Sequence, residues 1–234
     1  MTLPPNTPRK LLLIGASRGL GHALSVEFAE RGWHVTGTLR APSGTPLHDL
    51  AAARPDRIRT ERLEITEAAS ITALRARLEG QVYDMLFVNA GTTNADPTAP
   101  LEQVPPEDFA ALMLTNVLGP LRVIAALEDL VRPGGLIGVM SSGQGSLANN
   151  RTGGREAYRA SKAALNQALR SLSARRPGRP LLLMAPGWIR TALGGPEAPF
   201  GLEETIPDIA DTLLSRLDRP GLAYLERSGA TLPW

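Results

Sequence analysis

Short apolar runs alternate with amphipathic stretches along almost the whole 234-residue chain, and this alternation limits the possible folds more than any other feature. A short continuous apolar run is typical of a strand that is buried on both faces. Apolar residues at every third or fourth position are typical of a helix packed on a sheet. The pattern predicts strands at residues 11–14, 33–39, 58–65, 83–88, 136–140, 181–184 and 222–226, and helices at residues 20–31, 47–53, 68–79, 106–131, 156–175 and 203–217.

Parallel strands that follow one another through helices need crossover connections, which are right-handed and place helices on both faces of the sheet. The sequence therefore predicts one α/β domain over residues 1–234, built on a doubly wound, seven-stranded parallel sheet. Residues 58–65 alternate apolar with charged side chains, which indicates a strand near an edge. No linker, internal repeat or low-complexity tract divides the chain.

The composition weighs against several classes of protein. The chain has no cysteine, which excludes a disulfide framework, a thiolate zinc site and a cysteine nucleophile. A net charge of +2 without a run of basic residues gives little reason to expect a nucleic-acid partner. The three histidines lack metal-ligand spacing, so we expect no metal. With no uninterrupted long apolar run and no cleavage-site pattern, we expect a cytoplasmic protein outside the membrane.

A glycine-rich turn follows the first predicted strand and reads Gly15-Ala16-Ser17-Arg18-Gly19-Leu20-Gly21. Glycines at such a strand-to-helix turn let the backbone approach a pyrophosphate and leave helix N–H groups free to bind it. A tight turn without a ligand is the alternative. The preceding strand and the following amphipathic helix are the context that favours nucleotide binding.

Tyr158 and Lys162 are four positions apart in a predicted helix, so their side chains share one face. An ammonium group beside a phenol favours the phenolate and lowers the phenol pKa, which would suit Tyr158 to act as a general acid and base. A surface pair is the alternative reading. Only two of the 25 basic residues, Lys10 and Lys162, are lysine, and a compact charge fits a phenol or a ribose hydroxyl better than a guanidinium does.

Together these residues resemble the short-chain dehydrogenase/reductase family. The matching motifs occur in the family's order and approximate spacing over nearly the whole chain: Gly15–Gly21, Asn89-Ala90-Gly91, Asn116, Ser141-Ser142, Tyr158 with Lys162, and Pro186-Gly187 with Thr191. The resemblance implies a single-domain Rossmann fold with the nicotinamide against the helix that bears Tyr158.

The resemblance also implies a role for each catalytic residue. Tyr158 would give a proton to the carbonyl being reduced, and Lys162 would hold the nicotinamide ribose and lower the Tyr158 pKa. Ser142 rather than Ser141 would bind the substrate oxygen, and Asn116 would help to keep a water relay. The implied cofactor contacts are Gly15, Ser17, Arg18, Gly19, Leu20, Gly21, Arg40, Glu64, Ile65, Asn89, Ala90, Gly91, Tyr158, Lys162, Pro186, Gly187, Ile189 and Thr191.

The C-terminal part, from Pro186 through residues 194–199 to Leu232-Pro233-Trp234, resembles the C-factor/sniffer-type branch of small carbonyl-reductase-like members. Some positions depart from the family pattern. Ile14 stands where a threonine is usual, and Glu64 replaces the aspartate expected to meet the adenine. A long glycine-rich loop, residues 143–157, separates Ser142 from Tyr158, so ligand binding is one way to set their geometry.

The predicted cofactor is NADP(H). An NAD site in this fold has a carboxylate at the end of the second strand, where it binds the ribose hydroxyls. Here that strand ends in Arg40, and Arg18 lies inside the glycine turn. Two guanidinium groups at one place would repel each other unless an anion such as a 2′-phosphate lies between them.

The leading hypothesis is an enzyme that interconverts a small carbonyl compound and an alcohol with NADP(H). The alternative is a catalytically weak, nucleotide-binding signalling or regulatory protein of the C-factor type. The resemblance implies a homodimer through the helices at residues 106–131 and 156–175. The second helix carries Ala163, Ala164, Ala168 and Leu169, which face either the partner or the sheet. The loops around the expected pocket carry no distinctive charge that would identify the substrate.

Overall fold

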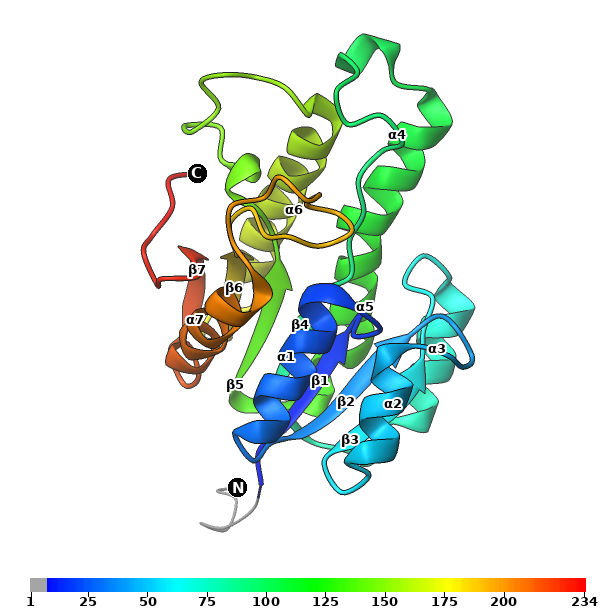
Figure 1. Cartoon of the computed structure of the whole chain (residues 1–234). Coiled ribbons are helices and arrows are strands. Elements are labelled where there is room, and N and C mark those ends of the chain that lie inside the picture. Colours follow the sequence, from blue (N-terminus) through cyan, green and yellow to red (C-terminus); the bar gives the residue numbers. More distant parts are fainter. Residues whose placement is uncertain (1–7) are drawn as a thin grey trace.

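Seven parallel strands form the centre of the molecule in the computed structural model, which describes residues 8–234 (Figure 1). Their order across the sheet is β3-β2-β1-β4-β5-β6-β7. The strands are β1 (Lys10–Ile14), β2 (His34–Leu39), β3 (Ile58–Arg62), β4 (Tyr83–Val88), β5 (Val131–Met140), β6 (Pro180–Ala185) and β7 (Gly221–Glu226). The predicted doubly wound parallel sheet is confirmed, and β3 lies at an edge as its alternating sequence predicts.

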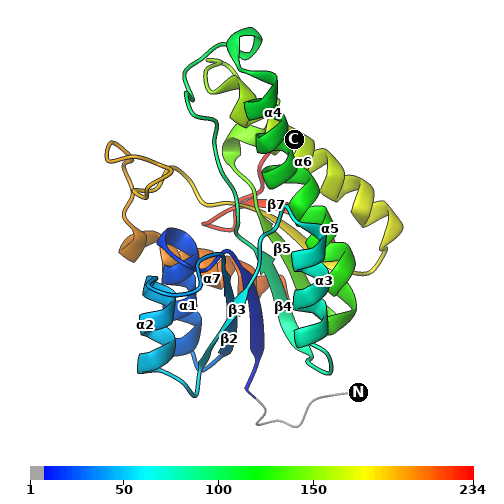
Figure 2. The same cartoon turned by 90° about the vertical axis from the view of Figure 1, so that its right-hand side faces the viewer.

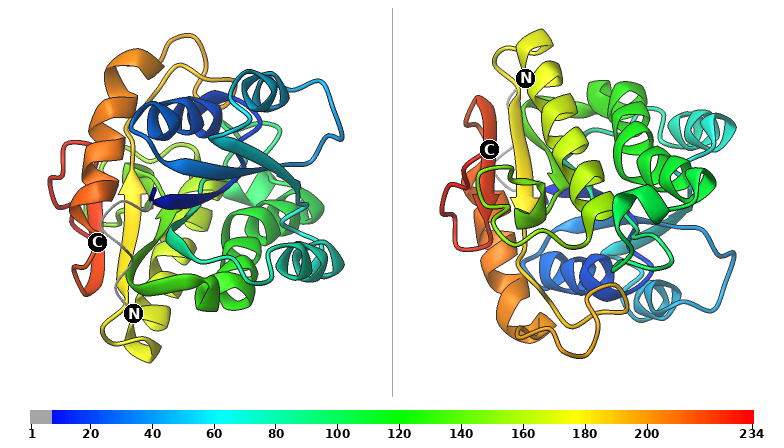
Figure 3. Two further views of the ribbon diagram at one scale, coloured as in Figure 1. Left: turned by 90° about the horizontal axis from the view of Figure 1, so that it is seen from below. Right: turned by 90° about the horizontal axis from the view of Figure 1, so that it is seen from above.

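Helices cover both faces of this sheet (Figure 3). One face carries α1 (Gly19–Glu30), α2 (Pro46–Ala53) and α7 (Leu202–Ser215), and the other carries α3 (Ala68–Arg77), α5 (Gly119–Leu127) and α6 (Glu156–Arg175). The helix α4 (Pro106–Met113) precedes α5 and projects beyond the sheet (Figure 2).

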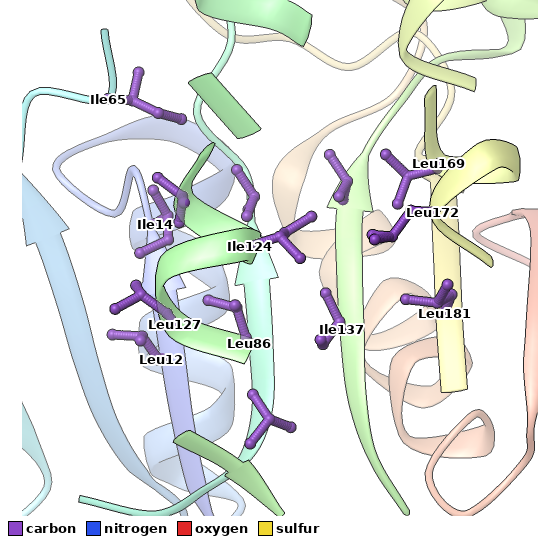
Figure 4. Close-up of a cluster of buried hydrophobic side chains, with 14 of the residues drawn as sticks. Leu12, Ile14, Ile65, Leu86, Ile124, Leu127, Ile137, Leu169, Leu172 and Leu181 are labelled. Atoms are coloured by element: carbon purple, nitrogen blue, oxygen red, sulfur yellow. The ribbon is translucent and has the colours of Figure 1, made fainter. Parts of the chain in front are cut away.

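Two hydrophobic cores lie between the sheet and its helix layers, because successive strand residues point to opposite faces. In β1, Leu12 and Ile14 pack under α3, α5 and α6, whereas Leu11 and Leu13 pack under α1 and α7. Figure 4 shows the first of these cores. It brings together Leu86, Ile124, Leu127, Ile137, Leu169, Leu172 and Leu181, among others.

The predicted single helix at residues 106–131 is wrong in detail. It is divided into α4, a π-helical segment at Leu114–Leu118, α5 and a short 3₁₀ turn at Glu128–Leu130. Pro120 lies at the start of α5 and has no N–H to donate to the preceding turn, while its ring crowds the carbonyl four residues earlier. A widened π turn is a usual answer to such a local disturbance.

Other predicted bounds shift by a few residues. The third strand ends at Arg62 rather than at residue 65, and β5 begins at Val131, five residues before the predicted start. Gly134 adopts a φ of 78°, and the pairing of β5 with β4 shifts register here. The proline and glycines of this stretch hid the strand because they disfavour regular strand structure.

The run Pro106–Leu130 is, by length and composition alone, apolar enough to cross a membrane, with a mean hydropathy of 1.7 in its most apolar window. Only 39% of that window is buried. The run did not stand out in the sequence because polar residues such as Asn116 and Arg122 interrupt it. Its α5 part contributes Val123, Ile124 and Leu127 to the core, which is typical of a helix that packs on a sheet.

Chain connections after β1 and β4 run to opposite sides of the sheet, since β1 lies between β2 and β4. The carboxyl ends of parallel strands at such a switch point flank a crevice in which ligands bind in open α/β folds. The fold therefore points to this edge as the functional site.

Candidate active site

The glycine turn between β1 and α1 is closed by backbone contacts that leave no room for side chains. A methyl group on Gly15, where φ is +84°, would lie 2.8 Å from the Ala90 Cα. A methyl group on Gly21 would lie 2.1 Å from the Gly15 carbonyl oxygen. The Gly15 N–H donates to Thr38 Oγ1 at 2.9 Å. Thr38 therefore supplies the turn hydroxyl that Ile14 cannot.

The start of α1 is left open for an anion. Arg18 occupies the N-cap position in extended conformation, and its side chain does not cap the helix. The first N–H groups of a helix have no partner within it and carry a partial positive charge. Ser17, Gly19 and Leu20 are half-buried around these groups, and a Cβ on Gly19 would lie 3.8 Å from Thr191. The segment after β6 thus lies across the helix start.

Asn89, Ala90 and Gly91 join the end of β4 to this turn. The Asn89 side-chain amide donates to the Gly15 carbonyl at 2.8 Å, and the Ala90 N–H donates to the Ile14 carbonyl at 3.0 Å. A Cβ on Gly91 would lie 3.4 Å from Asn116 Oδ1 and 3.5 Å from Lys162 Nζ. The glycine turn and the buried Lys162 therefore lie on either side of this segment.

Arg40 and Glu64 face each other beyond the ends of β2 and β3. Arg40 Nη1 lies 3.7 Å from Glu64 Oε2, and the Arg40 side chain is 76% exposed. Glu64 also accepts hydrogen bonds from the N–H and the hydroxyl of Thr66. Burial opposes ionisation of Glu64, but the Thr66 bonds and Arg40 outweigh it and lower the pKa. The buried Ile65 packs in the core, so any contact with a nucleotide would come from its backbone.

The segment that follows β6 is held by hydrogen bonds within it and by one from Arg227, which follows β7. Arg227 donates to the Pro186 carbonyl at 3.2 Å, and Gly187 adopts a φ of 91°. Ile189 is buried and forms a bridge with Phe200. Thr191 Oγ1 accepts a bond from the Gly194 N–H at 3.0 Å. These contacts fix the segment opposite the glycine turn.

Tyr158 and Lys162 are buried side by side on α6, as their spacing predicts. Lys162 Nζ lies 5.6 Å from the centroid of the Tyr158 ring and donates to the Met140 carbonyl at 3.0 Å. Asn116 Oδ1 accepts a hydrogen bond from the Thr92 N–H. Its side-chain N–H groups donate to the Thr92 carbonyl and the Ser161 hydroxyl. Asn116 therefore connects the loop after β4 to the catalytic face of α6.

The predicted lowering of the Tyr158 pKa by Lys162 is not what the structure gives. Burial raises the pKa of Tyr158, and the nearby Ser142 hydroxyl and Arg155 guanidinium only partly oppose this. Burial likewise lowers the pKa of Lys162 to about 8. Desolvation disfavours the charged form of both groups.

Of the two adjacent serines, Ser142 is the one beside the phenol. The Ser141 hydroxyl is buried and donates to Asn166 Oδ1 at 2.6 Å. The Ser142 hydroxyl accepts a bond from the Gln144 N–H at 3.2 Å, and the Ser142 carbonyl accepts one from the Tyr224 hydroxyl. This arrangement favours Ser142 for contact with a substrate oxygen.

A sequence model of the short chain dehydrogenase family matches residues 9–199. The chain belongs to the short-chain dehydrogenase/reductase family.

Among solved structures, this dehydrogenase/reductase is similar to a Burkholderia multivorans short-chain dehydrogenase/reductase with bound NADP, with 55% identity and a TM-score of 0.95 over 97% of this chain and 100% of that chain. The carbonyl reductase Sniffer of D. melanogaster is 26% identical with a TM-score of 0.86 over the same shares. The C-signal protein of Myxococcus xanthus is 36% identical over 155 residues, which cover 64% of this chain and 92% of that protein. The predicted family and branch are thereby confirmed.

Sequence reasoning missed several residues of this dehydrogenase/reductase site. Thr38 and Ser161 lay inside a strand and a helix, where a single hydroxyl carries no signal. Tyr224 comes from β7, far from Ser142 in the sequence, and only the fold brings them together. Arg155 was overlooked because the chain has many arginines. Among residues 8–234, no group of three or more acidic or histidine side chains is placed to hold a metal ion.

Proposed function

We propose that this protein is an NADP(H)-dependent oxidoreductase that interconverts a carbonyl compound and an alcohol by hydride transfer. The observation that carries the proposal is the half-buried Ser142 together with the buried Tyr158 and Lys162, near the open start of α1. The NADP bound to the Burkholderia relative supports the cofactor. The similarity to the carbonyl reductase Sniffer supports the reaction.

The residues present fit a dinucleotide. The uncapped N–H groups at the start of α1 suit a pyrophosphate, which the glycine turn lets approach. The Lys162 ammonium has three donors and, among residues 8–234, a single acceptor, the Met140 carbonyl, so it has donors left for a ribose hydroxyl. When bound, the nicotinamide would supply the hydride to the carbonyl carbon or take it from the alcohol.

Proton transfer falls to Tyr158. In the direction of reduction, its hydroxyl gives a proton to the substrate oxygen, to which Ser142 donates a hydrogen bond. Because burial raises the Tyr158 pKa, the phenol is protonated at neutral pH and ready to act as the acid. Asn116 keeps Thr92 and Ser161 in place behind the lysine, so its role is to position the site.

The 2′-phosphate of NADP(H) would lie by Arg40 and Arg18. In the described part of the chain, the one ion pair of Arg40 is the solvent-accessible pair with Glu64, and such pairs contribute about 0–1 kcal/mol. Its guanidinium is therefore free to bind a phosphate in addition.

The C-signal relative supports a second candidate, a nucleotide-binding signalling protein with little turnover. The presence of every residue of the catalytic group favours the enzyme. Cofactor binding without turnover on any carbonyl compound would favour the signalling protein instead.

A panel of ketones and aldehydes, followed by NADPH absorbance, tests the proposal. We expect Tyr158→Phe to lower kcat by about 10²–10⁴-fold, the usual contribution of general acid catalysis, without weakening NADPH binding. Tyr83→Phe is the matched control, because Tyr83 is also buried but donates to Thr36 in β2. A Tyr158→Phe protein as active as the parent would contradict the assignment.

The proposal extends to the assembly and the compartment. We propose a cytoplasmic homodimer that pairs through α4, α5 and α6. Ala168 lines an apolar groove between these helices, whereas Leu169 faces the sheet. Of the four candidates on α6, Ala168 is thus the one that lines this groove.

A further inference from the structure

The loop between Ser142 and Tyr158, residues 143–155, carries polar atoms that lack partners. Gln144 Oε1 and Arg155 Nε are both buried, and neither has a hydrogen bond within the described part of the chain. Leaving such an atom unpaired is costly, so buried polar atoms nearly always have a partner. One of these atoms, Arg155 Nε, is a donor that belongs to a charged group next to the proton donor.

Arg155 holds a positive charge against the catalytic phenol. Its guanidinium carbon lies 5.3 Å from the centroid of the Tyr158 ring. Within residues 8–234, no carboxylate lies within ion-pair distance of this guanidinium, although twelve other pairs of that kind are formed. A partly buried cation without an anion beside it is electrostatically incomplete.

The backbone at Arg155 is also unusual. Its φ of 51° lies in the left-handed region, which costs a residue with a Cβ roughly 1 kcal/mol or more. The preceding Gly153 and Gly154 have positive φ values as well, but glycine adopts these freely. A glycine at 155 would relieve the strain, so the side chain itself has a use.

Holding the loop to α6 is not that use, because neighbouring residues already do so. Arg159 Nε donates to the Gly154 carbonyl at 2.8 Å. Glu156 accepts the Leu101 N–H at 2.9 Å, which joins the start of α6 to the segment before α4. The Arg155 side chain makes no such hydrogen bond within the described residues, and its guanidinium lies near the ring of Tyr158 instead.

We propose that Arg155 binds a carboxylate group of the substrate, so that the preferred substrates are small acidic carbonyl compounds. The proposal rests on the proposed carbonyl reduction. A guanidinium fork matches a carboxylate with two parallel hydrogen bonds. Because Arg155 lies against Tyr158, the carboxylate and the reacting carbonyl are separated by only a few carbon atoms.

The kinetic test compares keto acids with their methyl esters, which keep the carbonyl but lose the charge. We expect the parent to prefer the acids and Arg155→Met to lower kcat/KM for them about 10- to 150-fold, mainly through KM, the range for one charge-assisted hydrogen bond. The esters report what loss of the charge does to Tyr158 itself, so the ratio of kcat/KM for the acids to kcat/KM for the esters is the quantity that should fall. Arg155→Lys, which keeps the charge but not the fork, should recover part of the loss.

Arg151→Met is the matched control, because Arg151 is an exposed arginine of the same loop. Arg151→Met should leave kcat/KM unchanged for both the acids and the esters. Thermal melting and NADPH titration of each variant establish that folding and cofactor binding are intact. Equal rates of the parent on acids and esters, or an equal loss on both in Arg155→Met, would overturn the proposal while leaving carbonyl reduction intact.

A binding measurement separates this proposal from the proposed function. Calorimetry with the protein and NADP⁺ would titrate the saturated carboxylic acid of the same length, which has no carbonyl to reduce, and the matching phosphonic acid. We expect the carboxylic acid to bind the parent and Arg151→Met but not Arg155→Met. If the carboxylic acid binds but no carbonyl compound is turned over, the proposed carbonyl reduction is refuted while carboxylate binding at Arg155 stands. Binding of the phosphonate alone would overturn the carboxylate assignment.

Discussion

Lys162 shows at the scale of one residue how the site works against the stability of the fold. The residue is 4% exposed, and burial lowers the pKa of its ammonium from 10.5 to about 8. A shift of this size corresponds to roughly 3 kcal/mol of unfavourable charge burial at neutral pH. Tyr158 has the complementary problem, because burial opposes its phenolate. Perturbed groups of this kind are concentrated at functional sites.

The pH dependence of stability tests the state of Lys162. Because its pKa is lower in the folded than in the unfolded chain, the unfolded chain binds more protons between pH 8 and 10.5, and stability rises with pH in that window. Lys162→Met removes this rise. We therefore expect the melting temperature of the parent, relative to the variant, to increase from pH 8 to 10, with Lys10→Met behaving like the parent. Parallel curves for parent and Lys162→Met would contradict the prediction.

Arg40 is expected to select the cofactor. Arg40→Asp removes a phosphate partner and places a carboxylate beside Glu64, which repels a 2′-phosphate. One charge-assisted bond is worth about 1.5–3 kcal/mol, or roughly 10- to 150-fold in affinity. We expect titrations with NADPH and NADH at fixed ionic strength to show a preference for NADPH that the variant loses or inverts. Arg219→Asp, at an exposed position before β7, should leave the preference for NADPH unaltered. Equal affinities of the parent for NADPH and NADH would refute the assignment.

At the scale of elements, the sequence predicted every strand and the order of the motifs, but not the break in the helix at residues 106–131. Hydrophobic periodicity detects which segments are buried, and it is insensitive to one widened turn. Gly119-Pro120 was the available signal. The π segment places Asn116 so that its amide meets both Thr92 and Ser161, and such turns are frequent at functional sites.

Asn116 is therefore expected to stabilise the loop after β4. Asn116→Leu keeps the volume but leaves the N–H and carbonyl of the half-buried Thr92 without their Asn116 partner. The cost is at most about 1–3 kcal/mol for each group, the range for full burial. We expect a lower midpoint of chemical unfolding and faster hydrogen exchange at the Thr92 amide. Asn149→Leu, at an exposed loop position, serves as the control. An unchanged exchange rate at Thr92 would mean that Asn116 does not hold this loop.

For the whole molecule, the sequence could predict the features that local patterns and the order of the motifs determine. The carboxyl edge of the sheet gathers Gly15, Asn89, Ser142 and Tyr158, and parallel topology makes that meeting necessary. The contacts of Arg155 and of Tyr224 depend on loop paths and on strand packing far along the chain, and no local pattern reports those. The direction of the Tyr158 pKa shift was wrong for the same reason, since desolvation is a property of the packed molecule.

The apolar groove of α4, the π segment, α5 and α6 provides the last prediction. It has a volume of about 440 Å³, is lined by Met113, Leu114, Val117 and Leu121 among others, and includes Leu118, which is 44% exposed. Such a patch on helices that also pack on the core suits pairing with a second copy about a twofold axis.

We expect light scattering at micromolar concentration to give the mass of a dimer for the parent and of a monomer for Leu118→Arg, because a charge at the centre of an isologous interface is buried twice. Leu147→Arg is the matched control, since Leu147 is 75% exposed in the loop before α6, away from the groove. It should remain dimeric. A monomeric parent would refute pairing through this groove, and a dimeric Leu118→Arg would move the interface to another face of the molecule.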